Sequence, residues 1–270
     1  MSKDQEYFRG KTATVTGAAS GIGLALVEEL LRRDVAKVVL ADVNPERLNE
    51  HEARLKTEYG DRVKGILCDV TAEENVQKMI AKSATFFGGQ FDLLFNNAGA
   101  PFPGWFDEAK NVDWKIAFDL NFFSAVYGMR AVLPIMVKQG SGQIVNIISG
   151  IAFSPMPMQS RYSATKAALH ACSLSLRAEY GDSNIKISSA TPGTVATPIW
   201  QGSKIPDTAQ TPQQSACRIL LGAANDDRII FGDDADIKGA ISGHLPVFNK
   251  EVDQFFLNIA RERRKGNVGF

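Results

Sequence analysis

The sequence has few cysteines and no long apolar run, and both absences narrow the classes of protein it can encode. Three cysteines occur in 270 residues, far apart and without a CxxC pair, so we expect no disulfide framework. No uninterrupted apolar stretch approaches the ~20 residues that a membrane-spanning helix needs. The charged start of the chain lacks the apolar core of a signal peptide. We therefore expect a cytoplasmic protein without a membrane partner.

Net charge and metal-binding motifs are also lacking. Thirty basic residues balance thirty acidic ones, which gives no reason to expect a nucleic acid or an anionic membrane as partner. The three histidines show no HExxH or other ligand spacing, so we expect no metal site. Apolar residues make up 44% and charged residues 22% of the chain, as in ordinary globular proteins. The length suits a single domain over residues 1–270.

Short β-rich runs alternate with longer helical patterns along the chain. This alternation predicts a parallel sheet covered on both faces, and right-handed crossovers favour a doubly wound Rossmann fold of about seven strands. We expect a lid loop at 198–212 and an extended C-terminal segment at 232–270 that includes a helix over 248–264. Strands are expected at 12–16, 37–42, 63–68, 92–95, 143–149, 185–190 and 228–231. Helices are expected near 21–34, 45–59, 72–87, 112–138 and 160–180.

A glycine-rich loop joins the first expected strand to the first long helix. Its spacing is G-x-x-x-G-x-G, which differs from the G-x-G-x-x-G of many dinucleotide sites. Glycines allow backbone to approach a pyrophosphate, and the helix N-terminus offers free N–H groups to it. A purely structural turn is the alternative. The residues expected to contact a cofactor here are Gly17, Ser20, Gly21, Ile22 and Gly23.

An acidic residue closes the second strand. Asp42, followed by Val43, occupies the place where a carboxylate binds the ribose hydroxyls of NAD and repels the 2′-phosphate of NADP. The alternative is a surface aspartate that caps the next turn. Later strand ends carry Asp69 and Val70, where the carboxylate can lie near the adenine amino group. A further strand end carries Asn97, Ala98 and Gly99, where small residues let a cofactor lie against the backbone, although ordinary turn chemistry also uses such residues.

Tyr162 and Lys166 are four residues apart on an expected helix and so share one face. An ammonium beside a phenol favours the phenolate, so we expect Lys166 to lower the pKa of Tyr162 toward a useful acid/base range. Ser149 ends the preceding strand, and its hydroxyl can polarise a substrate carbonyl. Asn121 lies inside a long expected helix, where asparagine is mildly unfavourable, so a proton-relay or helix-kink role is expected for it.

These motifs occur in one order, and together with Pro192-Gly193-Thr194-Val195-Ala196-Thr197 they resemble the short-chain dehydrogenase/reductase family. The resemblance runs from about Lys11 to Pro198. It implies that Tyr162 is the general acid/base, that Lys166 binds the nicotinamide ribose, and that Ser149 holds the substrate oxygen. It further implies a water anchored by Asn121. The nicotinamide side would be lined by Pro192, Gly193, Val195 and Thr197.

The resulting hypothesis is an NAD-dependent oxidoreductase that interconverts a secondary alcohol and a ketone. An NADPH-linked carbonyl reductase and a non-catalytic nucleotide-sensing protein of the same fold remain alternatives. A serine hydrolase is a poor alternative because Ser149 lacks a G-x-S-x-G elbow. Phe153 and Trp200, among aromatic and apolar residues that follow strands, predict a mainly apolar substrate. We expect a homodimer formed through 112–138 and 160–180, since the long C-terminal segment departs from the family's short tail.

Overall fold

The computed structural model describes residues 3–197, 205–243 and 250–266. Within them lies one parallel sheet in the order β3-β2-β1-β4-β5-β6-β7, so the predicted doubly wound sheet is confirmed. The strand order reverses beside β1, where chain connections leave for opposite faces. The strands are β1 (Thr12–Thr16), β2 (Lys37–Asp42), β3 (Val63–Leu67), β4 (Leu93–Asn96), β5 (Gly142–Ile147), β6 (Ile185–Ala190) and β7 (Ile229–Ile230).

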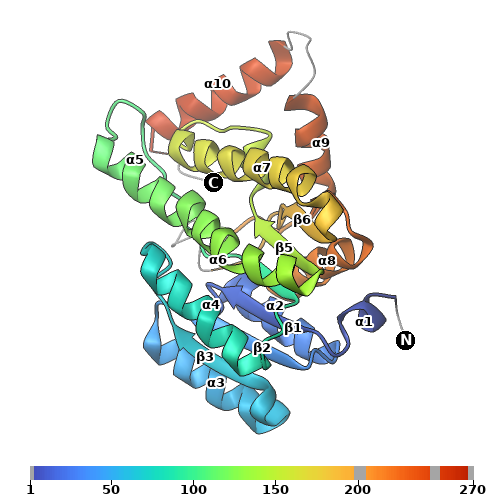
Figure 1. Ribbon diagram of the computed structural model, residues 1–270. Helices are drawn as coiled ribbons and strands as arrows, with labels where there is room; N and C mark the ends of the chain where they lie inside the picture. The colour runs from blue at the N-terminus through green and yellow to red at the C-terminus, as the bar shows by residue number, and fades with distance from the viewer. Residues whose placement is uncertain (1–2, 198–204, 244–249, 267–270) are drawn as a thin grey trace.

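Helices cover both faces of this sheet, as the nearly all-apolar strands require (Figure 1). One core layer joins the sheet to α2 (Gly21–Arg32), α3 (Pro45–Tyr59) and α8 (Pro212–Asn225). The other joins it to α4 (Glu73–Phe87), α6 (Ser124–Gln139) and α7 (Ser160–Glu179). The short α1 (Lys3–Phe8) packs against α8.

A long helical segment replaces the single helix expected at 112–138. It consists of α5 (Asn111–Phe118), a π-helical turn at Asp119–Phe123, and α6. By length and composition alone, Asn111–Gln139 would be able to cross a membrane, but here α6 packs on α4 and α5 on α7. The π-helical turn contains Asn121, so the expected helix distortion is present.

The C-terminal segment forms α9 (Asp234–Gly243) and α10 (Lys250–Arg264), which lie beyond β7 beside the end of α7 in Figure 1. Helix α8 was not expected from the sequence, although Thr211 and Gln214 form a capping box directly before it. Part of the expected lid, 198–204, lies outside the described residues. The end of that loop is held against the segment after β6, because the N–H of Ala196 donates to the carbonyl of Gln210 at 2.9 Å.

Candidate active site

Two adjoining cavities open at the carboxyl ends of the strands, where doubly wound sheets bind ligands. The cofactor-side cavity, of about 380 Å³, runs from the glycine loop past Asp42 to Lys166. The substrate-side cavity, of about 360 Å³, lies between Ser149 and the segment 192–197. Tyr162 lines both cavities, so a group held in one lies next to a group held in the other.

Backbone atoms of the glycine loop form one wall of the cofactor-side cavity, because its glycines carry no side chains. Gly17 has a φ of +62°, a conformation that L side chains rarely adopt. A Cβ on Gly23 would lie 2.1 Å from the carbonyl oxygen of Gly17, so only glycine lets the helix start pack against the loop. The amide of Asn97 fixes the same turn by donating to the carbonyls of Thr16 and Gly17 at 2.9 and 3.2 Å. Ser20 sits at the N-cap of α2 with no capping bond from its side chain.

Asp42 lies at the end of β2, at the far side of the same cavity. Its carboxylate accepts hydrogen bonds from the backbone N–H groups of Ala19 and Asn44, both at 2.9 Å. These bonds hold the carboxylate beside the glycine loop. Asp69 lines the cavity as well, but it is exposed and its Oδ1 accepts from the N–H and hydroxyl of Thr71, which lowers its pKa. Asp69 therefore also has the turn-capping role that was the alternative for such residues.

Most residues expected to contact the cofactor line the cofactor-side cavity. Gly23 does not line the cavity; it packs against the carbonyl of Gly17, which does. Gly193 and Val195 line the substrate-side cavity instead. Residues predicted from the sequence and placed on the cofactor side are Gly17, Ser20, Gly21, Ile22, Asp42, Val43, Asp69, Val70, Asn97, Ala98, Gly99, Tyr162, Lys166, Pro192 and Thr197.

Ser149, Tyr162 and Lys166 meet where the two cavities join. Ser149 follows β5, and its side chain is near enough to the phenol of Tyr162 to lower the pKa of that phenol. The Nζ of Lys166 lies 5.8 Å from the centre of the Tyr162 ring and donates to the carbonyl of Ile147 at 2.9 Å. Lys166 is buried, and a Cβ on Gly99 would lie 3.2 Å from its Nζ. The absence of a side chain at Gly99 thus leaves the ammonium next to the cavity.

The expected lowering of the pKa of Tyr162 is wrong. Burial, together with the negative charge of Asp236, raises the pKa of Tyr162 to about 12, although the nearby Ser149 hydroxyl opposes this shift. Burial lowers the pKa of Lys166 to about 8. At neutral pH the site therefore holds a protonated phenol and a mostly protonated ammonium, which is the state needed to give a proton to a carbonyl oxygen.

Asn121 is buried and its amide ties three elements together. Its Oδ1 accepts from the N–H of Ala100 at 2.9 Å, and its Nδ2 donates to the carbonyl of Ala100 at 3.0 Å and to Thr165 Oγ1 at 3.3 Å. Thr165 in turn donates to the carbonyl of Tyr162 at 2.8 Å. The side chain therefore positions the loop after β4 against the helix that carries Tyr162. The water-anchoring role implied by the family resemblance stays a prediction.

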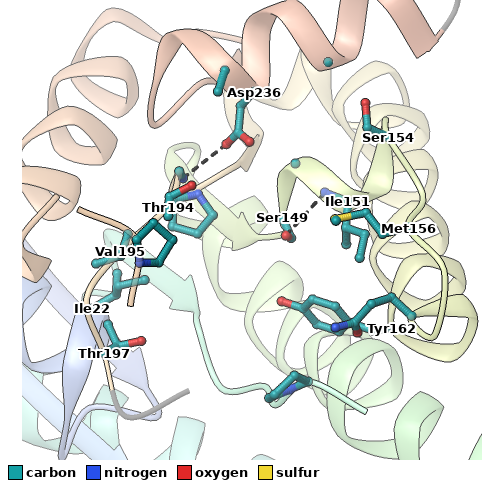
Figure 2. A pocket seen from close by; sticks show the side chains of 18 residues that line it. Ile22, Ser149, Ile151, Ser154, Met156, Tyr162, Thr194, Val195, Thr197 and Asp236 are labelled. Carbon is teal, nitrogen blue, oxygen red and sulfur yellow. Dashed lines mark hydrogen bonds between the residues drawn. The ribbon is translucent and has the colours of Figure 1, made fainter. Parts of the chain in front are cut away.

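Figure 2 shows the substrate-side cavity, with Ser149 and Tyr162 facing Thr194, Val195 and Thr197 across it. Its apolar walls include Ile151 and Met156. Phe153 was expected in this wall, but the described lining does not include it. Phe153 is buried instead, with its ring against His170 and Phe231, because its position after the short helical turn at Gly150–Ala152 points it into the core. Trp200 lies outside the described residues.

The C-terminal segment contributes to this cavity in a way that the sequence did not indicate. Asp236 and Gly239 of α9 line it. Helix α10 contacts neighbouring loops, since Arg263 donates to the carbonyl of Pro157 and the guanidinium of Arg264 stacks over Trp105 with 4.3 Å to the ring centre. One general rule could have indicated this contribution: residues after β7 emerge at the same edge of the sheet as the other strand ends, where the ligand site lies.

Comparisons with known proteins agree with this geometry. The family model for short chain dehydrogenases matches residues 11–207. An uncharacterized oxidoreductase of Staphylococcus aureus strain MRSA252 is 37% identical over 213 residues, which cover 79% of this chain and 90% of the relative. Similar solved structures include a short chain dehydrogenase/reductase from Burkholderia phymatum in complex with NAD, with a TM-score of 0.80 and 26% identity over 87% of this chain and 93% of that one.

A second similar structure is L-sorbose reductase from Gluconobacter frateurii complexed with NADPH and L-sorbose. Its TM-score is 0.76, at 27% identity over 83% of this chain and 95% of that chain. The two solved structures hold different nicotinamide cofactors, so the likeness establishes the cofactor class and leaves the choice between them to the residues of this chain. The family model covers the chain from the glycine loop to the segment after β6. The chain therefore belongs to the short-chain dehydrogenase/reductase family and is an oxidoreductase of that family.

Proposed function

We propose that the protein is an NAD-dependent oxidoreductase that interconverts a secondary alcohol and a ketone with Tyr162 as general acid/base. The observation that carries this proposal is the position of Tyr162 between the two cavities, in the same cavity wall as Ser149 and next to Lys166. A protein that only bound nucleotides would not need a phenol, a hydroxyl and an ammonium at this junction. The apolar walls at Ile151, Met156 and Val195 favour a substrate with an apolar body.

The residues of the cofactor-side cavity fit a nicotinamide dinucleotide. The bare backbone at Gly17 and the uncapped start of α2 at Ser20 suit a pyrophosphate, and Asp42 suits the two hydroxyls of a ribose. Lys166 would donate to the hydroxyls of the second ribose with its remaining protons. When bound, the nicotinamide supplies or accepts the hydride.

The chain's own residues handle the proton and the orientation of the substrate. For ketone reduction, the Ser149 hydroxyl and the Tyr162 phenol both donate to the carbonyl oxygen, which polarises the C=O bond. Tyr162 then gives its proton to that oxygen as the carbon receives hydride, and the resulting phenolate is stabilised by the nearby Lys166 ammonium. Oxidation of the alcohol reverses these movements, with Tyr162 taking the hydroxyl proton.

A panel of secondary alcohols and ketones, followed by NADH absorbance, tests the activity directly. We expect turnover of at least one compound together with NADH binding to the purified protein. Binding of NADH with no turnover of any compound would support the nucleotide-sensing alternative and contradict our proposal. The cytoplasmic location is likewise proposed, since Cys68, Cys172 and Cys217 are all free thiols.

We expect the wild-type protein to prefer NADH over NADPH, because the Asp42 carboxylate is held where a 2′-phosphate would meet like charge. Asp42→Ala should raise the NADPH/NADH ratio of kcat/KM by about tenfold or more, since like-charge contacts cost enough to change affinity by that factor. Asp42→Arg should raise it further. Steady-state kinetics with both cofactors measures the ratio.

Glu46→Ala provides a matched control. Glu46 lies in the first turn of α3, is exposed and is not part of the described cavity lining. Its replacement by alanine removes the same unit of charge as Asp42→Ala. The ratio should stay within twofold of wild type in this variant. A wild-type protein that already uses NADPH more efficiently than NADH would show that the NAD assignment is wrong.

We also propose a homodimer formed through α5, α6 and α7. Exposed apolar side chains lie on α5, α6 and the π-helical turn between them, with Val112, Ile116, Phe123 and Val137 all at least 39% exposed. Ile116→Asp should convert the dimer to a monomer in light scattering at micromolar concentration, because the new charge would be buried in the interface. Leu221→Asp on α8, which is 49% exposed on the other side of the sheet, should leave the dimer intact. A monomeric wild type would contradict the proposal.

A further inference from the structure

A single carboxylate from the C-terminal segment lines the substrate-side cavity close to the reacting groups. Asp236 of α9 lies above Ser149 and Tyr162 in Figure 2. Its charge acts on the phenol of Tyr162, which places it in electrostatic reach of the catalytic oxygen. The proposed alcohol–ketone chemistry does not use this carboxylate.

The position of the Asp236 carboxylate is fixed by the chain on both sides. Its Oδ2 accepts from the N–H of Gly193 at 3.1 Å, and the nearby Thr191 hydroxyl favours the ionised carboxylate by lowering its pKa. On the other side, a Cβ on Gly150 would lie 1.9 Å from Oδ1, so the missing side chain next to Ser149 makes room for the carboxylate. Since an ionised carboxylate can accept about four hydrogen bonds, the bond from Gly193 leaves acceptor capacity on a side chain that lines the cavity.

No cationic side chain balances this charge in the described lining, where Asp236 is the only ionisable group besides Tyr162. Burial raises the pKa of Asp236 to about 6, and the negative charge of Asp233, one turn earlier, contributes to this rise. Both carboxylate oxygens of Asp233 already accept backbone hydrogen bonds, Oδ2 from the Thr194 N–H and Oδ1 from the Asp236 N–H. Asp236 is only partly buried, yet a carboxylate withdrawn from water without a counter-charge is still costly, and a ligand that donates to it removes part of that cost.

Neutral polar groups extend the same wall. Gln159 lines the cavity, is 3% exposed, and its Oε1 has no hydrogen-bond donor among the described residues. Ser154 lines the cavity beside Gly239, where a Cβ would lie 2.7 Å from the Ser154 hydroxyl. The wall around Asp236 therefore offers more acceptors than a purely apolar substrate can use.

We infer that Asp236 is a specificity-determining residue that binds a hydrogen-bond-donating group, a hydroxyl or an ammonium, which the substrate carries near its reacting carbon. This rests on the proposed alcohol–ketone chemistry and adds a polar end to the apolar substrate body. A substrate with a carboxylate at that end is disfavoured, because it would meet the negative charges of Asp236 and Asp233.

The test compares three matched series: unbranched 2-ketones of increasing chain length, and the same ketones with a hydroxyl or an amino group on the carbon next to the carbonyl. Each is assayed with NADH and with NADPH. We expect kcat/KM to be at least about tenfold higher for one donor-bearing series than for the parent ketones, since bonds to charged groups are the stronger class. Asp236→Leu, similar in size, should reduce that ratio to about one.

Asp236→Asn distinguishes the two donors. An amide oxygen still accepts from a hydroxyl, so a preference for hydroxyketones should be largely kept, whereas a preference for aminoketones depends on the charge and should be lost. Asp234→Asn, two residues away, exposed and outside the described lining, is the control and should change neither ratio. Thermal unfolding of each variant with NADH and the preferred compound gives a second readout, because a bound ligand raises the midpoint.

The outcomes separate the two proposals. Turnover of parent and donor-bearing ketones with equal efficiency would overturn the role of Asp236 and leave the proposed function standing. An equal fall in kcat/KM for all three series in Asp236→Leu would show that Asp236 only supports the segment at Gly193, and would also overturn the inference. No turnover of any compound with either cofactor would overturn the proposed function and this inference with it.

Discussion

Replacing Tyr162 by phenylalanine is expected to lower kcat by at least ~100-fold, the usual scale of general acid–base catalysis. The substitution removes only the phenol oxygen of a residue that lines both cavities. Affinity for NADH should change little, because the glycine loop and Asp42 are untouched. Steady-state turnover and a fluorescence titration with NADH measure the two quantities separately.

Tyr180→Phe is the matched control, since Tyr180 lies at the C-cap of the same helix, far along the chain from the site, and loses the same oxygen. Its turnover should remain within twofold of wild type. Turnover of Tyr162→Phe at the wild-type level would show that another group moves the proton. A loss of NADH binding together with turnover would instead show that the phenol is needed to build the cofactor site.

The sheet could be predicted closely because its strands are buried on both faces. A run such as Lys37–Asp42 is almost continuously apolar, and that pattern is visible without knowledge of neighbours. Helix α8 was missed although Pro212 follows a capping residue, because the polar, proline-containing stretch before it suggested irregular structure. The distortion at Asn121 was expected because asparagine is unfavourable inside a helix, but its bonds to Ala100 depend on a loop whose path no local pattern shows.

Much of the candidate site was also predictable, because parallel strands bring their carboxyl ends to one edge. Asp42 and Ser149 are found by that rule, and their placement in the cavities agrees with it. Electrostatics was not predictable. The spacing of Tyr162 and Lys166 suggested a lowered phenol pKa, but burial dominates and raises it, and burial depends on the whole fold. Asp236 was missed because the sequence shows several acidic residues after β7 without showing which one turns inward.

Substituting Gly23 by alanine should weaken NADH binding at least about tenfold and lower the thermal unfolding midpoint. The new Cβ would lie 2.1 Å from the Gly17 carbonyl oxygen and 2.6 Å from the Asn97 amide nitrogen, distances at which backbone must move. Overpacking of this kind costs about 1–3 kcal/mol. Because Asn97 holds the loop through the carbonyls of Thr16 and Gly17, the displacement would move the backbone that faces the pyrophosphate.

Gly181→Ala is the control, since a Cβ there meets no heavy atom within 4 Å. Its unfolding midpoint and NADH affinity should match wild type, which excludes a general effect of losing a glycine. Wild-type NADH affinity in Gly23→Ala would mean that the loop can shift without affecting the ligand, and the pyrophosphate would then have to be bound elsewhere. Weakened binding combined with normal turnover at saturating NADH would place the defect in the loop alone, because Ser149 follows β5 and Tyr162 and Lys166 lie on α7, away from the displaced backbone.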